Sequence, residues 1–128
     1  MSSVVEVQLY SGGRNPRFVL SRDDAAEMRR VFAIEFARNA PADPGAPRLG
    51  YQGFIVYEND LTGATVPMGS WQPRLRVMDG VATLLYGPYA GQSRRAPALE
   101  RHLIATARRA DLGPLLDSAH LNHGEDEE

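Results

Sequence analysis

The stretch Arg74-Leu-Arg-Val-Met-Asp-Gly-Val-Ala-Thr-Leu-Leu85 decides the fold, because two β-prone runs meet at Asp79-Gly80. Asp-Gly suits a two-residue type I′ turn, which joins two antiparallel strands in a tight hairpin. With this turn, Leu75 faces Leu84 and Val77 faces Ala82, and we assign this apolar side to the core. The other side pairs Arg74 with Leu85, Arg76 with Thr83 and Met78 with Val81.

Three more strands are expected outside the hairpin. Val5, Val7 and Leu9 alternate with polar residues, which predicts a half-buried first strand. After a turn that contains glycine and proline, residues 17–20 form a short second strand that we expect to pair back on the first. Residues 51–58 are apolar on both faces, as is typical of a central strand.

Two main helices are expected as well. Ser21 can cap the first helix by accepting from the backbone N–H of Asp24, and Pro41 lies just beyond its end. Its buried stripe consists of Ala25, Met28, Val31, Phe32 and Phe36. Pro97 suits the first turn of the second helix, and Gly113-Pro114 is expected to end it. Its inward stripe consists of Leu99, His102, Leu103, Thr106, Ala107 and Ala110.

The order of these elements is β-β-α-β-β-β-α, with strands grouped rather than alternating with helices. This grouping predicts an α+β two-layer sandwich with a mainly antiparallel sheet of about five strands and two main helices. A chain of 128 residues is long enough for one domain. We expect this globular domain to span residues 1–113 and to be followed over 114–128 by a short turn and an acidic tail.

The composition excludes several classes of function. The chain has no cysteine, which excludes disulfide frameworks and thiol nucleophiles and favours a reducing, cytoplasmic setting. No apolar run is long enough to cross a membrane, and no phosphate-binding motif occurs, so we expect neither a membrane nor a cofactor. All 14 basic residues are arginine, and four of the 16 acidic residues end the chain, which leaves the body at +2 (14 minus 12). This near-neutral body disfavours nucleic acid as a partner.

Arginine and aromatic residues predict a binding surface on the outer side of the hairpin. Arg74 and Arg76 are expected to point the same way from one strand, close to Trp71 and to Tyr51 or Tyr57. Guanidinium groups beside aromatic rings can bind a carboxylate, a phosphate or an acidic partner. A solvent-facing strand in a chain without lysine would give the same pattern, so both interpretations stay open.

The same outer side also carries Met78, Val81 and Leu85, which is unusually apolar for a solvent-facing surface. This pattern indicates that a second copy of the chain or another protein covers it.

Three other features are candidates for chemistry. His102 interrupts an apolar helix stripe, where it could act as an acid or base in a pocket between the last helix and the sheet, or be held by a neighbouring backbone group. His120 and His123 are three residues apart, as two metal ligands on one helix face would be, although a solvated tail explains them better. Arg14 follows a glycine pair and could bind an anion, although a hairpin turn also explains this segment.

These observations favour a small accessory or binding protein that contacts a protein partner, a second copy of itself or an anionic small molecule. The alternative is a small cofactor-independent enzyme that uses His102. We consider an enzyme the weaker of the two interpretations, because no nucleophile motif occurs.

Overall fold

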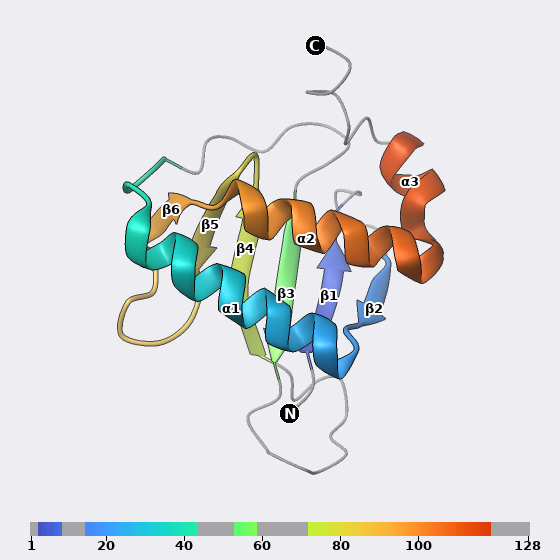
Figure 1. Cartoon of the computed structure of the whole chain (residues 1–128), viewed down its shortest axis with the longest axis horizontal. Helices are drawn as coiled ribbons and strands as arrows, with labels where there is room; N and C mark the ends of the chain where they lie inside the picture. The colour runs from blue at the N-terminus through green and yellow to red at the C-terminus, as the bar shows by residue number, and fades with distance from the viewer. Residues whose placement is uncertain (1–2, 9–14, 44–52, 59–71, 119–128) are drawn as a thin grey trace.

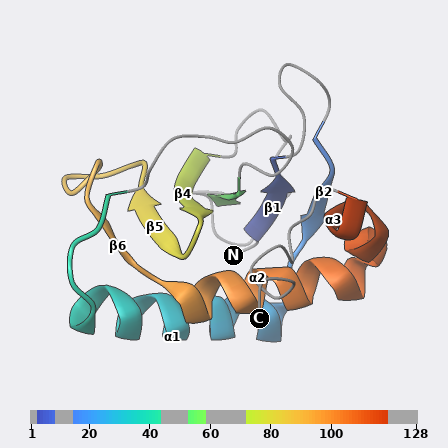
Figure 2. The ribbon, with the colours of Figure 1, turned by 90° about the horizontal axis from the view of Figure 1, so that it is seen from above.

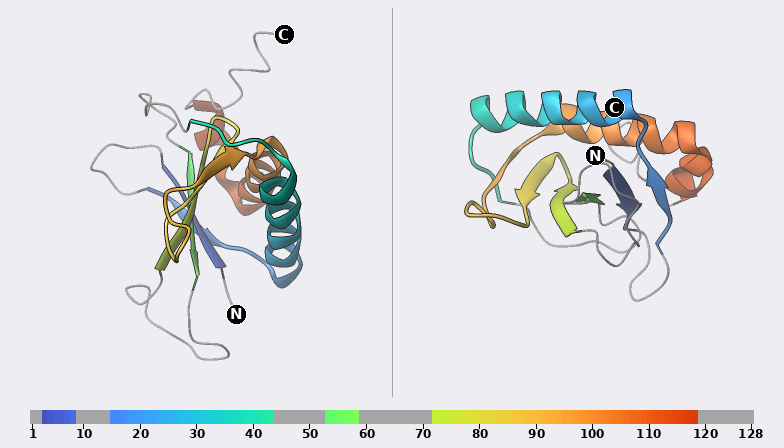
Figure 3. Two further views of the ribbon diagram at one scale, coloured as in Figure 1. Left: turned by 90° about the vertical axis from the view of Figure 1, so that its left-hand side faces the viewer. Right: turned by 90° about the horizontal axis from the view of Figure 1, so that it is seen from below.

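The computed structural model describes residues 3–8, 15–43, 53–58 and 72–118 of the chain. The strands are β1 (Ser3–Val7), β2 (Arg17–Val19), β3 (Phe54–Glu58), β4 (Gln72–Met78), β5 (Val81–Leu84) and β6 (Ser93–Arg95). The helices are α1 (Arg22–Arg38), α2 (Pro97–Ala107) and α3 (Gly113–Ser118), and the helical segment η2 (Arg108–Leu112) joins α2 to α3. The strands form one antiparallel sheet in the order β2-β1-β3-β4-β5-β6, and α1 and α2 cover one face of it (Figure 1). Figures 2 and 3 show the sheet and the helices as two layers.

This architecture confirms the predicted α+β fold on an antiparallel sheet. The sheet has six strands in the described part of the chain rather than about five, because residues 93–95 pair with β5 at one edge. Their sequence, Ser-Arg-Arg, has no apolar alternation. Backbone hydrogen bonds alone can add such a short edge strand, so side-chain periodicity does not reveal it.

The hairpin forms as predicted. Asp79 and Gly80 have φ angles of 52° and 73°, and two positive values in succession identify the type I′ turn. The observed register pairs Leu75 with Leu84, Arg76 with Thr83, Val77 with Ala82 and Met78 with Val81. Two backbone groups of the turn are also bound by the start of α2. Gly80 N donates to Glu100 Oε1 over 2.7 Å, and Ala96 N donates to Gly80 O over 2.7 Å.

The core lies between the sheet and the helices. It consists of Val5, Val7, Leu20, Ala25, Met28, Phe54, Val56, Leu75, Val77, Ala82, Ala96, Leu99, Leu103, Ala107 and Leu116. Close packing leaves no room for a side chain at Gly53, where φ is +97° and a Cβ would lie 2.3 Å from the carbonyl oxygen of Val77. Glycine is therefore required at the entry to β3.

The first strand differs from its prediction in burial. All five residues of β1 are buried, although the alternation predicted a half-buried strand. Val5 and Val7 join the core as expected, whereas Glu6 lies on the opposite face and is only 7% exposed. Burial of Glu6 is tolerated because Arg17 Nε donates to its Oε1 over 2.6 Å.

Helix α1 begins at its predicted cap, since Asp24 N donates to Ser21 Oγ over 3.1 Å. Ala25 and Met28 are fully buried, whereas Phe32 packs at the border of the core. A charged residue on the same helix, Glu35, is also buried, which the apolar pattern did not predict.

Glu35 caps the other helix. The residue before α2 is Ala96, whose side chain cannot accept a hydrogen bond from the helix N-terminus. Glu35 supplies this acceptor from α1: Leu99 N donates to its Oε1 over 2.7 Å, and Ala98 N donates to its Oε2 over 3.2 Å. The positive end of the helix dipole further stabilises the buried carboxylate. The side chain of Asn39 donates to Glu35 Oε2 over 3.4 Å and to Arg95 O over 2.6 Å.

The end of α2 corrects one prediction. Gly113 does not end the helix, because the chain kinks earlier, at Ala110 and Asp111, and Asp111 has the left-handed φ of 66°. Aspartate tolerates this conformation better than most residues do. Glycine is the usual signal of a helix end, so an end at an aspartate is harder to predict from the sequence. Gly113 and Pro114 instead start α3, which places Leu116 in the core. None of these observations tests the prediction that the globular domain ends at residue 113.

We predict that Glu35→Ala lowers the free energy of unfolding by about 2–3 kcal/mol, because it leaves two backbone N–H groups of α2 without an acceptor. Urea unfolding at pH 7, followed by circular dichroism, measures this loss. Glu27→Ala is the matched control on the same helix, since Glu27 pairs with Arg30 only at the surface. An equal effect of the two substitutions would contradict the cap.

Candidate ligand pocket

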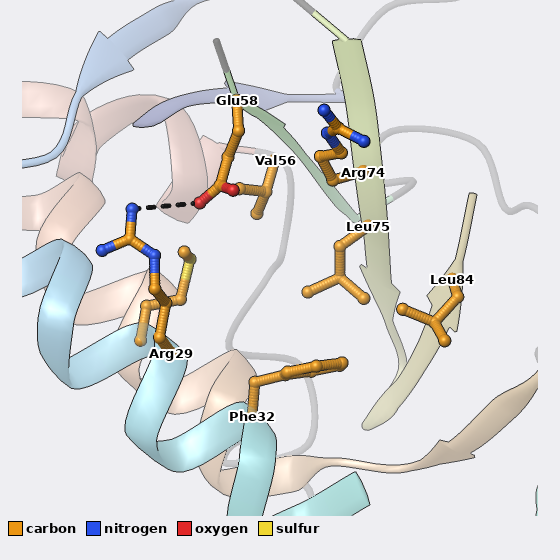
Figure 4. A pocket seen from close by; sticks show the side chains of 8 residues that line it. Arg29, Phe32, Val56, Glu58, Arg74, Leu75 and Leu84 are labelled. Carbon is orange, nitrogen blue, oxygen red and sulfur yellow. Dashed lines mark hydrogen bonds and ion pairs between the residues drawn. The ribbon is translucent and has the colours of Figure 1, made fainter. Parts of the chain in front are cut away.

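A pocket of about 180 Å³ lies between α1 and the sheet. Its lining is mostly apolar and consists of Met28, Phe32, Val56, Leu75 and Leu84, with Arg29, Glu58 and Arg74 as its charged members. Figure 4 shows Phe32, Leu75 and Leu84 turned toward the same space, with Arg29 on one side of it and Arg74 on the other. The pocket can hold the apolar part of a small molecule next to charged groups.

Arg29 and Glu58 form one polar side of the pocket (Figure 4). Arg29 Nη2 lies 3.2 Å from Glu58 Oε1, and Ser3 Oγ donates to the same carboxylate oxygen over 3.0 Å. Arg29 Nη2 also donates to Ser3 Oγ over 3.2 Å. Ser3 is fully buried, so this cluster fixes the middle of α1 to β1 and β3.

Arg74 reaches the pocket because of a β-bulge. β3 pairs Val56 with Leu75 but Tyr57 with Pro73, so Arg74 is the extra residue between them. Its guanidinium carbon lies 4.0 Å from the centre of the Tyr86 ring, in a cation–π contact. Trp71, the aromatic neighbour that we predicted for Arg74, lies outside the described residues, as does Tyr51.

Arg76 lies elsewhere. It pairs with Ile55 and Thr83, on the side of the sheet opposite the core residues Leu75 and Val77. Its Nε is buried and has no hydrogen-bond partner among the described residues. The bulge breaks the alternation of side chains along β4, so Arg74 and Arg76 do not share one surface as the sequence led us to expect.

Met78 and Val81 lie on the same side as Arg76 and are 4% and 6% exposed. These two residues therefore present little apolar surface that another chain could cover. Leu85 is half-buried.

Tyr57 belongs to the polar cluster around Glu6 on the outer face. Its hydroxyl donates to Glu6 Oε1 over 3.5 Å, and the guanidinium carbon of Arg17 lies 5.1 Å from its ring centre. Gln8 and Asn15 also donate to Glu6 Oε2. Burial raises the pKa of Tyr57, and the negative charge of Glu6 raises it further. Tyr57 and Arg74 are therefore in different sites.

His102 connects the two long helices. Its Nε2 lies 2.9 Å from the backbone oxygen of Asp24, which can only accept, so Nε2 carries the proton. Arg109 Nη2 lies 2.7 Å from Asp24 Oδ1, and this hydrogen bond holds the pKa of Asp24 below its usual value. His102 lines neither the pocket of Figure 4 nor the shallower hollow beside β2 that Asp24 and Arg109 line.

The other predicted site residues, Arg14, His120 and His123, lie outside the described residues. Within the part of the chain that the structure describes, no group of three or more potential ligands could hold a metal ion. None of the helices in the same part is long and apolar enough to span a membrane.

No protein-family model, curated protein or solved structure matches the chain, so its function is inferred from the site itself.

Sequence patterns pointed to the pocket only in part. Met28, Phe32, Leu75 and Leu84 were predicted to face the core, and Arg74 to bind a ligand. Arg29, Glu58 and Tyr86 were not singled out. Glu58, a charge at the end of an otherwise apolar strand, was the one local indication available.

We predict that Arg109→Gln lowers stability at neutral pH but not in acid. Ionised Asp24 stabilises the folded chain above its ordinary pKa of 3.8, and this stabilisation disappears as the pH falls through the lowered value of the folded state. The variant should therefore be less stable than the wild type at pH 7, by less than about 1 kcal/mol for a pair this exposed, and equally stable near pH 2. Urea unfolding across this range measures the difference. Arg22→Gln, an exposed change on α1, should show no such pH dependence.

We also predict that Tyr57→Phe resists alkali better than the wild type. Because the pKa of Tyr57 is raised on folding, its stabilising effect is complete below the ordinary value of 10.0 and is lost as the pH rises toward the folded value. Above pH 10, the free energy of unfolding of the wild type should fall by up to about 1.4 kcal/mol per pH unit more than that of the variant. Tyr89→Phe, at an exposed position, should follow the wild type in denaturant unfolding.

Proposed function

We propose that this chain is a non-catalytic binding protein that holds a small anionic molecule with an apolar part in the pocket between α1 and the sheet. The pocket itself carries this proposal: five apolar and three charged side chains line a space of about 180 Å³, and most of the lining is apolar. An apolar cavity of about 150 Å³ is enough to bind benzene in another protein. The pocket thus has room for a body of similar size.

The pocket can be filled without loss of the fold. Its lining contains no residue of α2, whose Leu99 and Leu103 fill the fully buried part of the core. Entry of a ligand would therefore displace water rather than core side chains. The proposed setting is the cytoplasm, which the absence of cysteine supports.

Contact with a protein partner or a second copy of the chain is the second candidate function. The observation that favours it is the exposure of Tyr86 and Tyr89, at 52% and 63%, between β5 and β6. Tyrosine is enriched at protein interfaces. His102 is not proposed as a catalytic acid or base, because its Nε2 is hydrogen-bonded to the backbone oxygen of Asp24 in α1.

We predict that 1-hexanol, a neutral probe of the apolar part alone, raises the melting temperature by about 3–6 °C at ten times its dissociation constant. Leu84→Phe fills part of the pocket. The variant should need at least ten times more 1-hexanol for the same rise in melting temperature. Ile34→Phe places the same side chain at an exposed position of α1 and should leave the effect unchanged. Calorimetric scanning measures the melting temperature, and NMR of the leucine methyl groups locates the probe. Absence of both a thermal shift and methyl perturbations in the wild type would refute the pocket as a binding site.

A further inference from the structure

The charged residues of the pocket indicate which polar group its ligand carries. Two of the three are arginines, Arg29 and Arg74, and the third is Glu58. Arg29 is held by Glu58 and Ser3 in a closed cluster of hydrogen bonds. Arg74 comes from the opposite side of the pocket (Figure 4) and belongs to a different contact, with Tyr86.

Stacking on Tyr86 prepares Arg74 to bind a planar anion. A ring 4.0 Å from the guanidinium carbon occupies one face of the group, and it restricts the long side chain to few conformations. The N–H donors lie in the guanidinium plane, where a ring stacked on its face does not compete for them. A carboxylate approaches arginine in this plane, and an ordered guanidinium loses less conformational entropy on binding it.

We propose that the pocket selects small monocarboxylates with an apolar body of about six carbon atoms, and that Arg74, positioned by Tyr86, binds their carboxylate. This inference rests on the proposed function and specifies the class of ligand. The apolar lining accepts the body, and Arg74, which lines the same pocket, puts a positive charge at its border (Figure 4).

Glu58 disfavours two other classes of ligand in different ways. A phosphate with two negative charges would be repelled by its carboxylate more strongly than a monoanion would. A primary amine would be attracted by Glu58, but it would have to compete with Arg29, which already binds that carboxylate over 3.2 Å. A monoanion avoids both costs.

The test compares four ligands with the same six-carbon chain: hexanoate, 1-hexanol, hexylamine and hexyl phosphate. Dissociation constants are measured by NMR titration of the full chain at low and high salt. We expect hexanoate to bind about tenfold more tightly than 1-hexanol, as a charge-assisted hydrogen bond would provide. This ratio should fall as salt is added, because the carboxylate is bound near the surface.

Three variants assign the effect to Arg74. Arg74→Gln should bring the ratio between hexanoate and 1-hexanol close to one, and Tyr86→Leu should lower it partly by removing the stacked ring. Arg101→Gln removes an exposed arginine of α2 that does not line the pocket and should keep the wild-type ratio. Each variant is compared by this ratio, so a general loss of affinity or stability does not imitate the result.

The outcomes separate the class of ligand from the existence of the pocket. If 1-hexanol binds as tightly as hexanoate, or if hexylamine or hexyl phosphate binds most tightly, the carboxylate inference is overturned while the proposed binding function stands. If the ratio is unchanged in Arg74→Gln, Arg74 is not the carboxylate-binding residue. If none of the four ligands binds the wild type, the proposed function itself fails.

Discussion

A single buried carboxylate joins the two long helices of this protein. Glu35 reaches from the end of α1 to the first turn of α2 and accepts hydrogen bonds from Ala98 and Leu99. An isolated carboxylate is costly to bury, but one that accepts two backbone N–H groups at the positive end of a helix is stabilised. The start of α2 in turn binds both backbone groups of Gly80, in the turn of the hairpin. Glu35 thus links α1 to α2, and Glu100 and Ala96 at the start of α2 hold the hairpin whose strands form part of the pocket wall.

The antiparallel helix pair is held at both ends by polar contacts of different kinds. At one end Glu35 binds backbone groups that are shielded from water. At the other, Asp24 of α1 meets His102 and Arg109 through its backbone oxygen and its carboxylate, near the surface. Salt weakens the exposed contact far more than the buried one, so the two ends respond differently to solution conditions. Because α1 is fixed at both ends, Phe32 and Arg29 have a defined position over the sheet.

The sequence allowed the prediction of most features that depend on neighbours in the chain. The type I′ hairpin, its register, the Ser21 cap and the stripe of α1 follow from local rules, and the structure confirms them. Features that depend on distant residues were missed. The cap of α2 comes from a glutamate more than sixty positions away, and no pattern near Ala96 indicates it.

The candidate site shows the same division between local and distant features. Arg74 was predicted to lie with Arg76 on the outer side of the hairpin, whereas it lines the pocket between α1 and the sheet, at the extra residue of β4. A bulge of this kind is created by the pairing of two strands, so neither strand sequence reveals it alone. Tyr86 contacts Arg74 because the preceding residue, Leu85, donates from its backbone N–H to Arg74 O and so holds the chain beside it.

The position of the pocket follows from how the two long helices share one face of the sheet. α1 and α2 run side by side across it, so each covers a different part (Figure 1). Leu99 and Leu103 of α2 are fully buried and fill the space beneath that helix. Beneath α1, Met28 and Phe32 cover Val56, Leu75 and Leu84 without a residue of α2 in the lining, and a space of about 180 Å³ remains. Such a space lowers the stability of the fold in proportion to its volume. The close packing around Leu99 and Leu103 of α2 offsets this loss. The same shortage of side chains that weakens packing under α1 therefore creates the room that a ligand can use.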